Sequence, residues 1–414
     1  MPTSAFYNQT PDIAPTYPAK LVFALLISSV CYLAVLSLIN ARGIHVSAAL
    51  VTLVEGLIYV VCLGVLYKHM PLSTLALSFM VSAWIVFTWL IRQSPDIKSL
   101  RDLIIPILFI SLGRYVADVR FADQILKRIV YVVLAVGLFE VLFIDAYSNI
   151  FNTFSFYVIL GHASESAAMF TGQMLTLNGF RPEGIGRTLL PFLFGPHRAS
   201  SVLLEPVSLG NFAVVVLAWT LSKPWESIRA APFLAISVVV LIILCDSRFG
   251  LVVGGALIAL RLMPLGFIRK VMPTMPFLTL GLIMLVALLM PGNGDNIVGR
   301  TTFSGNHLMN MDIATIFGLN GQMSGYGDVG YAYVMSRFGA PLAIVLIFTI
   351  FLTQMPDERG MRFRGLIVFY LFANLAISGT SIFALKTGGL LWFLFGVLSA
   401  APSTASRSLQ ESKA

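Results

Sequence analysis

Long apolar runs separated by short polar segments dominate the chain from residue 20 to residue 401. A helix of about 20 apolar residues is long enough to cross the roughly 30 Å hydrocarbon core of a bilayer. The pattern therefore predicts about twelve membrane-spanning helices, at residues 20–40, 45–67, 72–91, 102–117, 129–147, 205–221, 231–246, 249–264, 274–290, 338–354, 365–382 and 387–401.

Two longer polar stretches interrupt this pattern, at about 148–204 and 291–337, and both are rich in Gly, Ser, Thr, Asn and aromatic residues. Polar tails occupy 1–19 and 402–414, so we expect one integral membrane domain over 20–401. The first stretch contains the apolar piece TLLPFLFGP, which is too short to span and is broken by Pro191 and Pro196. We expect this piece to lie at the interface or to dip into the membrane.

Composition points to the same class of protein. The chain is 57% hydrophobic and only 11% charged, whereas about a quarter of the residues of a soluble domain are charged. We therefore expect an all-α polytopic membrane protein, because a membrane β-barrel would show short alternating segments instead. The first apolar run is long enough to span, so no cleavable signal peptide is expected.

The net charge of +8 indicates orientation in this context and not nucleic-acid binding. Basic residues in the short loops favour cytoplasmic termini, which places both long polar stretches on the outer side. The loop from Arg92 to Arg101 opposes this trend. The cysteines Cys31, Cys62 and Cys245 all fall in apolar runs, where we expect small buried side chains and no disulfide framework.

The basic residues expected outside between 148 and 340 are all arginines. A guanidinium group matches phosphate oxygens in a bidentate way and keeps its charge when partly dehydrated. Such a set favours a phosphate or diphosphate ligand. Alternatively, each arginine reaches lipid headgroups or pairs with a loop acid. The set comprises Arg181, Arg187, Arg198, Arg248, Arg300 and Arg337.

Two short stretches carry the strongest chemistry. DSRFG at 246–250 places Arg248 between two apolar runs, where it either pairs with Asp246 or faces a polar cavity. HRASSVLLEPVSLGN at 197–211 places Arg198 before Glu205, which precedes Pro206 at a helix start. Glu205 is then either a helix cap or a group that orients an arginine or accepts a sugar hydroxyl. We expect DSRFG to fold against this stretch.

The second polar stretch offers a possible base and aromatic surfaces. A neutral imidazole such as that of His307 can take a proton from a hydroxyl near neutral pH, although a lone loop histidine is often merely solvated. The string GYGDVGYAY supplies Asp328, which is either a second candidate acid or a helix cap. It also supplies Tyr326 and Tyr331, whose rings could stack on sugar faces.

The sequence contains no D-x-D pair in an external stretch, no His and Cys cluster, and no Walker or GxGxxG loop. We therefore expect no metal site, no cofactor and no nucleotide substrate.

The stretches HRASSVLLEPVSLGN, DSRFG and GYGDVGYAYVMSRFG, set among about twelve spans and two external loops, resemble the bacterial polysaccharide polymerase and O-antigen ligase superfamily. Within this Wzy/WaaL-like group, the chain is most similar to exopolysaccharide polymerases of the xanthan GumE kind. The ligases carry a His followed by Asn, Ser or Gln, nine residues and G-x-x-[GTY]. Here His307 is followed by Leu308, nine intervening residues and Gly318, with Gly321 at the last position of the motif.

The resemblance implies a GT-C-like fold in the bacterial inner membrane and an inverting, metal-independent glycosyltransferase. Its donor would be a glycan on undecaprenyl diphosphate, lengthened by a lipid-linked repeat unit; a ligase would transfer the glycan to lipid A core. Arg198, Arg248 and Arg300 would bind the diphosphate, and His307 would be the first candidate base, ahead of Glu205 and Asp328. The expected partners are membrane lipids, a flippase and chain-length or export proteins. A lipid-linked sugar flippase is the alternative of a different class, and it would place its charges near the bilayer midplane.

Overall fold

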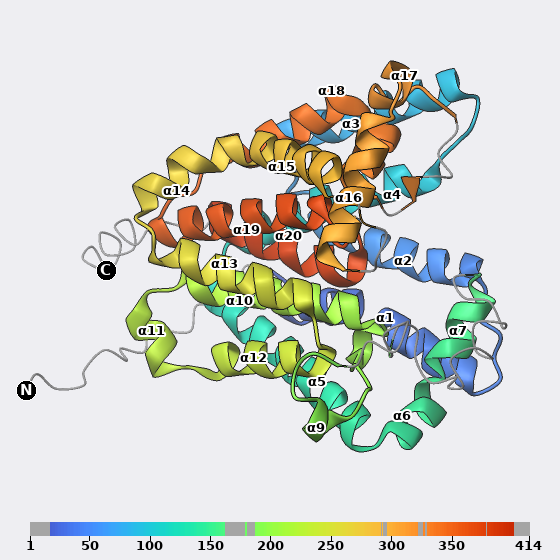
Figure 1. Cartoon of the computed structure of the whole chain (residues 1–414), viewed down its shortest axis with the longest axis vertical. Helices are drawn as coiled ribbons and strands as arrows, with labels where there is room; N and C mark the ends of the chain where they lie inside the picture. Colours follow the sequence, from blue (N-terminus) through green and yellow to red (C-terminus); the bar gives the residue numbers. More distant parts are fainter. Residues whose placement is uncertain are drawn as a thin grey trace, which may run out of the picture.

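The computed structural model describes residues 17–161, 179, 187–290, 292, 296–321, 326–327, 329–377 and 379–400. Every regular element in these ranges is a helix. The long helices lie roughly side by side, with α6, α7 and α17 at one end of the bundle and α11 and α14 at the other (Figure 1).

The helices of the bundle are α1 (Ala19–Ala41), α2 (Ala48–Leu66), α3 (Leu72–Arg92), α4 (Ile97–Val116), α5 (Val119–Leu142), α10 (Pro206–Ser222), α12 (Phe233–Cys245), α13 (Arg248–Leu262), α15 (Met275–Leu289), α18 (Tyr331–Leu352), α19 (Glu358–Ala376) and α20 (Leu385–Ala400). Shorter elements connect them: α6 (Ile144–Phe151), α7 (Thr153–Ile159), α9 (Pro191–Phe194), η2 (Ser201–Leu203), α11 (Trp225–Ala230), α14 (Leu265–Val271), η3 (Met272–Thr274), α16 (Ile297–Met309) and α17 (Ile313–Ile316).

Each of the twelve apolar segments predicted from the sequence coincides with a helix, but several boundaries differ. The segment predicted at 129–147 is α5, which already begins at Val119 because the Asp118 side chain accepts hydrogen bonds from the N–H groups of Arg120 and Phe121 at 2.9 and 3.1 Å. After Leu142 the chain bends by 117° into α6 and α7. The segment predicted from 338 is α18, which begins at Tyr331.

Five helical stretches in the described residues are long and apolar enough to cross a membrane, namely α1, α2, α3, α14 together with α15, and α18. The bent pair of α5 with α6 and α7 would be a sixth. The apolar helices α10, α12 and α20 are shorter, at 17, 13 and 16 residues. This set of helices is typical of a helical membrane protein.

Burial separates the interior helices from the peripheral ones. In α10, every residue from Ser208 to Ser222 is buried, and α20 is buried along most of its length. By contrast, α2, α3 and α15 expose large apolar side chains such as Leu57 (54% exposed), Phe79 (76%) and Leu282 (57%). Continuous exposed apolar surface of this kind suits contact with lipid and not with water.

At the α11 end of the bundle, one carboxyl group ties three helices together. Asp123 of α5 lies 2.7 Å from Lys223, which follows α10, and 3.3 Å from Arg359 of α19. The indole N–H of Trp219 donates to the same carboxyl oxygen at 2.6 Å. Interior helices are therefore held in register at this end by ion pairs, as well as by apolar packing.

Candidate functional site

A polar cavity of about 320 Å³ opens where α10 and α13 begin and α19 ends. Arg198, Glu205, Arg248 and Arg300 all line it. The structure thus brings together three predicted diphosphate-binding arginines and one predicted acid from segments spread over a hundred residues. The remaining lining residues come from α10, the turn before α13, the start of α16 and residues 374–381.

The segment that carries Arg198 is held by a buried acid that the sequence analysis did not include in the site. Glu140, near the end of α5, has no exposed surface. Its carboxyl oxygens accept hydrogen bonds from the backbone N–H groups of Ser200 and Ser201 at 2.8 and 2.6 Å. His197 Nε2 lies 3.0 Å from the same carboxyl group. Glu140 therefore holds the backbone that follows Arg198 and the side chain of the residue that precedes it.

The backbone of this segment is also strained. Ser201 and Leu204 have φ angles of 52° and 60°, in the left-handed region that side chains other than glycine rarely adopt. Each such residue costs about 1–3 kcal/mol and persists only where the surroundings impose it. Tyr147 helps to impose it by donating its hydroxyl to the Ser201 carbonyl at 2.8 Å. Strain of this kind is concentrated at functional sites.

The turn between α12 and α13 presents Arg248 to the cavity. The chain turns at Asp246, whose φ is 47°, and Ser247 then caps α13 by accepting a hydrogen bond from Gly250 N at 2.9 Å. Asp246 accepts the N–H groups of Thr188 and Leu189 at 3.0 and 2.7 Å. Arg248 Nε donates to Thr188 Oγ1 at 2.9 Å. Asp246 therefore fixes residues 188–189 beside the turn, and Thr188 in turn helps to orient Arg248.

The predicted packing of DSRFG against residues 197–211 is confirmed by Ser247, which lies against Gly210 of α10. The two residues that directly precede DSRFG also bind this stretch. Ala199 N donates to Leu244 O at 2.9 Å, and Arg198 Nε donates to Cys245 O at 3.2 Å. Gly210 of α10 permits this approach. A methyl group at that position would lie 2.6 Å from Ser247 Cβ and closer still to its hydroxyl.

Glu205 lies at the start of α10, but its side chain does not cap the helix. Its Oε2 accepts hydrogen bonds from Ser208 Oγ and from Lys386 Nζ, both at 2.7 Å. Lys386, in the first turn of α20, is only 8% exposed and also donates to Leu203 O at 3.1 Å. Among the described residues that line the cavity, Glu205 carries the one carboxyl group, and a buried cation holds it in place.

Two asparagines form another wall of the cavity. Asn211 Oδ1 accepts hydrogen bonds from Tyr370 Oη and from Asn374 Nδ2, both at 2.9 Å. Gly379 lies so close to the Asn374 amide that a Cβ atom at position 379 would come within 2.6 Å of the amide atoms. Asn374 is 1% exposed, so its amide packs within the wall, and its Oδ1 makes no hydrogen bond to the residues that the structure describes.

Arg300 reaches the cavity from α16, which lies in a stretch that the sequence analysis treated as an external loop. Asn296 starts this helix by accepting the N–H of Gly299 at 2.8 Å. Thr302 Oγ1 donates to Met290 O at 2.9 Å, so α16 folds back against α15. Arg300 itself is exposed.

His307, the first candidate base predicted from the sequence, does not line the cavity that holds Arg198 and Arg248. It lies seven residues after Arg300 on α16, about 10 Å further along the helix axis. Its ring contacts those of Phe303 and Tyr326, with centroids 4.4 and 5.6 Å away. Burial lowers the pKa of His307 below its ordinary value, so the imidazole is neutral at pH 7.

The two predicted sugar-binding tyrosines have different environments. Tyr326 is partly exposed beside His307. Tyr331 is only 3% exposed, packs on Phe372 and shares a hydrogen bond with Thr279, so its ring is not presented to a sugar in the polar cavity. Asp328 lies outside the described residues.

Of the six arginines expected on the outer side, the structure describes five, and three of these line the cavity. Arg187 binds backbone carbonyls instead, including those of His197 at 2.6 Å and Leu244 at 3.2 Å. Arg337 forms an ion pair with Asp96. Arg337 therefore fits the alternative of pairing with an acid, whereas Arg187 takes a third role and binds backbone carbonyls. Arg181 lies outside the described residues.

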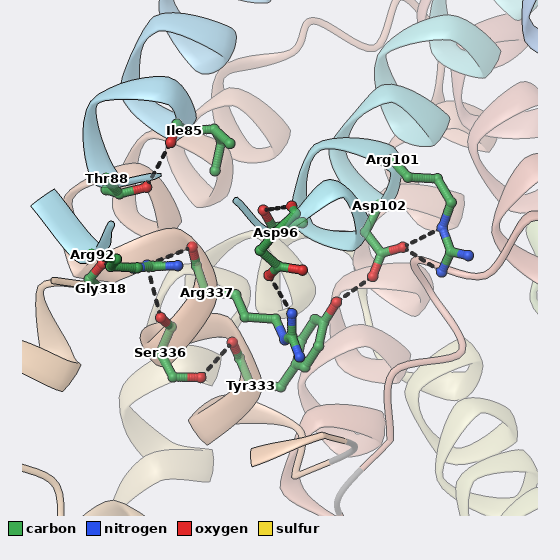
Figure 2. A network of polar contacts seen from close by, with 11 residues as sticks. Ile85, Thr88, Arg92, Asp96, Arg101, Asp102, Gly318, Tyr333, Ser336 and Arg337 are labelled. Atoms are coloured by element: carbon green, nitrogen blue, oxygen red, sulfur yellow. Dashed lines mark hydrogen bonds and ion pairs between the residues drawn. The ribbon is translucent and has the colours of Figure 1, made fainter. Parts of the chain in front are cut away.

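A second polar network joins the α3–α4 turn to α18 (Figure 2). Arg92 donates to the carbonyl oxygens of Gly318 at 2.5 Å and Ser336 at 2.9 Å. This contact lies beside a break in α18 at Gly339, whose φ is 76°.

The acids of this network have partners of their own. Asp96 pairs with Arg337, and the Asp102 carboxyl group accepts from Tyr333 Oη and from Arg101 Nη2, the latter at 2.9 Å. The acidic and basic side chains of this network are thus mostly paired with one another. The network therefore stabilises the broken helix α18.

Glu140, Lys386 and Asn374 support the site but are not among the residues predicted from the sequence. A charged residue inside an apolar run is the one signal that could have identified the first two, because such a residue requires a partner. For Asn374, the sequence offered no comparable signal.

No three His, Cys, Asp or Glu side chains gather as metal ligands in the residues that the structure describes. A scan against protein-family models, a search of curated proteins and a search of solved structures each returned no match.

Proposed function

We propose that this chain is a membrane glycosyltransferase that lengthens a glycan carried on a polyprenyl diphosphate. The observation that supports this proposal is the convergence of Arg198, Arg248 and Arg300 with Glu205 on one cavity. Three guanidinium groups around a cavity suit a diphosphate, and a carboxyl group beside them suits an acceptor hydroxyl.

The proposed reaction joins an acceptor hydroxyl oxygen to the anomeric carbon of the donor sugar. The bond from that carbon to the diphosphate oxygen breaks, and polyprenyl diphosphate leaves with the bonding electrons. Arginines fixed before the reaction stabilise the charge that develops on the leaving oxygens. The acceptor proton passes to Glu205, which now precedes His307 as the candidate base because it lines the cavity.

An apolar cavity provides a place for part of the prenyl chain. Its lining includes Leu375 and Ile382, which flank the segment 377–381 that borders the polar cavity. From there it continues between α3, α4, α18 and α20 past Ile107 and Ile350. A diphosphate held by the arginines could therefore extend its lipid into the helix bundle.

The proposal also includes the number of membrane spans and the orientation of the chain in the membrane. About twelve spans in a GT-C-like arrangement, in a bacterial inner membrane with cytoplasmic termini, would place the arginine cavity on the outer side. There the enzyme meets lipid-linked repeat units that have already been translocated. The donor would then be an undecaprenyl-diphosphate-linked glycan, and neither a metal nor a nucleotide is required.

Reconstitution in liposomes with a polyprenyl-diphosphate-linked repeat unit tests the proposal. Glycan lengthening is expected with the wild type and should be abolished in Arg248→Ala. Arg229→Ala, which removes an exposed arginine on α11, should behave as the wild type. Full activity in Arg248→Ala would contradict the proposed role of that residue. Transfer only to lipid A core would identify a ligase, and translocation without lengthening would identify a flippase.

A further inference from the structure

We propose that Phe303 and His307 of α16, together with Tyr326, form a sugar-binding subsite, against which a pyranose ring of the substrate glycan stacks. The assignment of this glycan to a lipid-linked substrate rests on the proposed function. The subsite extends the arginine cavity along the helix and gives His307 a binding role in place of a role as base.

The geometry of the three rings supports this subsite. The Phe303 and His307 rings meet at 72°, and the His307 and Tyr326 rings at 75°, so their planes form an angled surface. Phe303 is 50% exposed, and the other two rings are partly exposed. Aromatic rings bury apolar area well, and the C–H faces of pyranoses present such area.

Helical register connects this surface to the cavity. Asn296 and Arg300 line the cavity, and Phe303 and His307 follow at intervals of three and four residues on the same face of α16. Seven residues separate Arg300 from His307, about 10 Å along the axis. A short oligosaccharide that begins at a diphosphate bound by Arg300 would reach the rings.

Polar groups accompany the rings, as a sugar requires. Asn306, three residues after Phe303 on α16, and Asn310, three residues after His307 at the end of the helix, are both exposed. A carboxamide both donates and accepts hydrogen bonds, so it matches sugar hydroxyls. Because burial lowers the pKa of His307, its ring carries no charge at neutral pH and presents an aromatic face.

Binding to protein in nanodiscs, measured by native mass spectrometry, tests the subsite without requiring turnover. The probes are polyprenyl diphosphate and the polyprenyl-diphosphate-linked oligosaccharide fraction extracted from the source cells. The wild type should bind the glycan-bearing lipid more tightly than the bare lipid. Phe303→Ala and His307→Ala should each reduce that preference roughly threefold to tenfold, the usual contribution of an aromatic contact. Binding of the bare diphosphate should be unchanged.

Two further variants separate the alternatives. His307→Phe should keep the preference, because the ring remains; a loss equal to that of His307→Ala would overturn the stacking role of His307. Phe277→Ala removes another exposed phenylalanine, on α15, and should have no effect. Unchanged preference in Phe303→Ala would overturn the subsite. Unchanged binding of bare diphosphate in Arg248→Ala would instead contradict the proposed function and leave the subsite intact.

Discussion

The ammonium group of Lys386 lies 2.7 Å from Oε2 of Glu205, a residue 181 positions earlier in the chain. This contact joins the first turn of α20 to the start of α10, beside the arginine cavity. The Lys386 side chain is largely buried, whereas the Glu205 side chain is 30% exposed. The pair therefore both positions a cavity carboxyl group and connects two interior helices.

Replacing Lys386 by Met should lower the rate of glycan lengthening, because Glu205 loses the cation that fixes it. The expected loss of stability is about 1–3 kcal/mol, as for a hydrogen bond to a charged group. Initial rates in liposomes and melting temperatures in detergent measure the two effects.

A double-mutant cycle with Glu205→Gln provides the control for Lys386→Met. If the two residues act as a pair, Lys386→Met should reduce the rate much less in the Glu205→Gln background than in the wild type. Purely additive effects would show that Lys386 acts independently of Glu205.

Glu140→Gln should destabilise the protein by about 2–4 kcal/mol, because an amide cannot accept all the hydrogen bonds that converge on the buried carboxyl group. The mutation should also lower activity, since the backbone around Arg198 loses its support. Thermal unfolding and lengthening assays test both effects. Glu226→Gln, at an exposed acid of α11, is the matched control and should change neither. A wild-type melting temperature for Glu140→Gln would contradict this account.

Gly210→Ala should displace the α12–α13 turn, because the new methyl group would overlap the side chain of Ser247. Arg248 would move with the turn, so the rate of lengthening should fall at least about tenfold, as expected when a charged group in an active site is misplaced. The same assay applied to Gly255→Ala gives the comparison, since a methyl group at Gly255 meets no atom within 4 Å. Equal activity of the two variants would show that the close approach is not required.

His307 should contribute to the acid dependence of stability. Burial lowers its pKa in the native state, so the unfolded chain, with an ordinary value near 6.5, takes up the proton first as the pH falls. The native state should therefore lose stability as the pH falls from about 6.5 to the native pKa of His307. Above that range, His307 should cause no change of stability with pH. Melting temperatures of the wild type and His307→Gln across about pH 5 to 8 measure the difference. If the melting temperature of His307→Gln fell more steeply with decreasing pH than that of the wild type, the predicted direction of the effect would be wrong.

The apolar pattern predicted where the helices lie but not all of their ends. All twelve predicted segments are helical, because a long apolar run can bury its backbone groups only by internal hydrogen bonding. The start of α5 at Val119 depends on a polar cap, Asp118, which a hydrophobicity pattern does not register. Likewise, α16 is rich in Gly, Thr and Ser, and its packing on α15 stabilises it more than its own helix propensity does.

The arginines illustrate the same division. Their residue type and expected outer position favoured a phosphate ligand, and three of the five that the structure describes line one cavity. The sequence could not separate Arg248, which reaches the cavity, from Arg187, which binds backbone carbonyls around His197 and Leu244. That distinction depends on which carbonyl groups the turns leave without helical partners.

The sequence by itself determined that the chain forms long apolar helices and that a few charged residues stand at their ends, because both properties follow from local composition. Only the tertiary structure decided which of those charges meet. Glu140 supports Arg198, Lys386 holds Glu205, and His307 lies two helical turns beyond Arg300. Contacts between residues so far apart arise from helix packing and from the close approach at Gly210, and no local pattern encodes them.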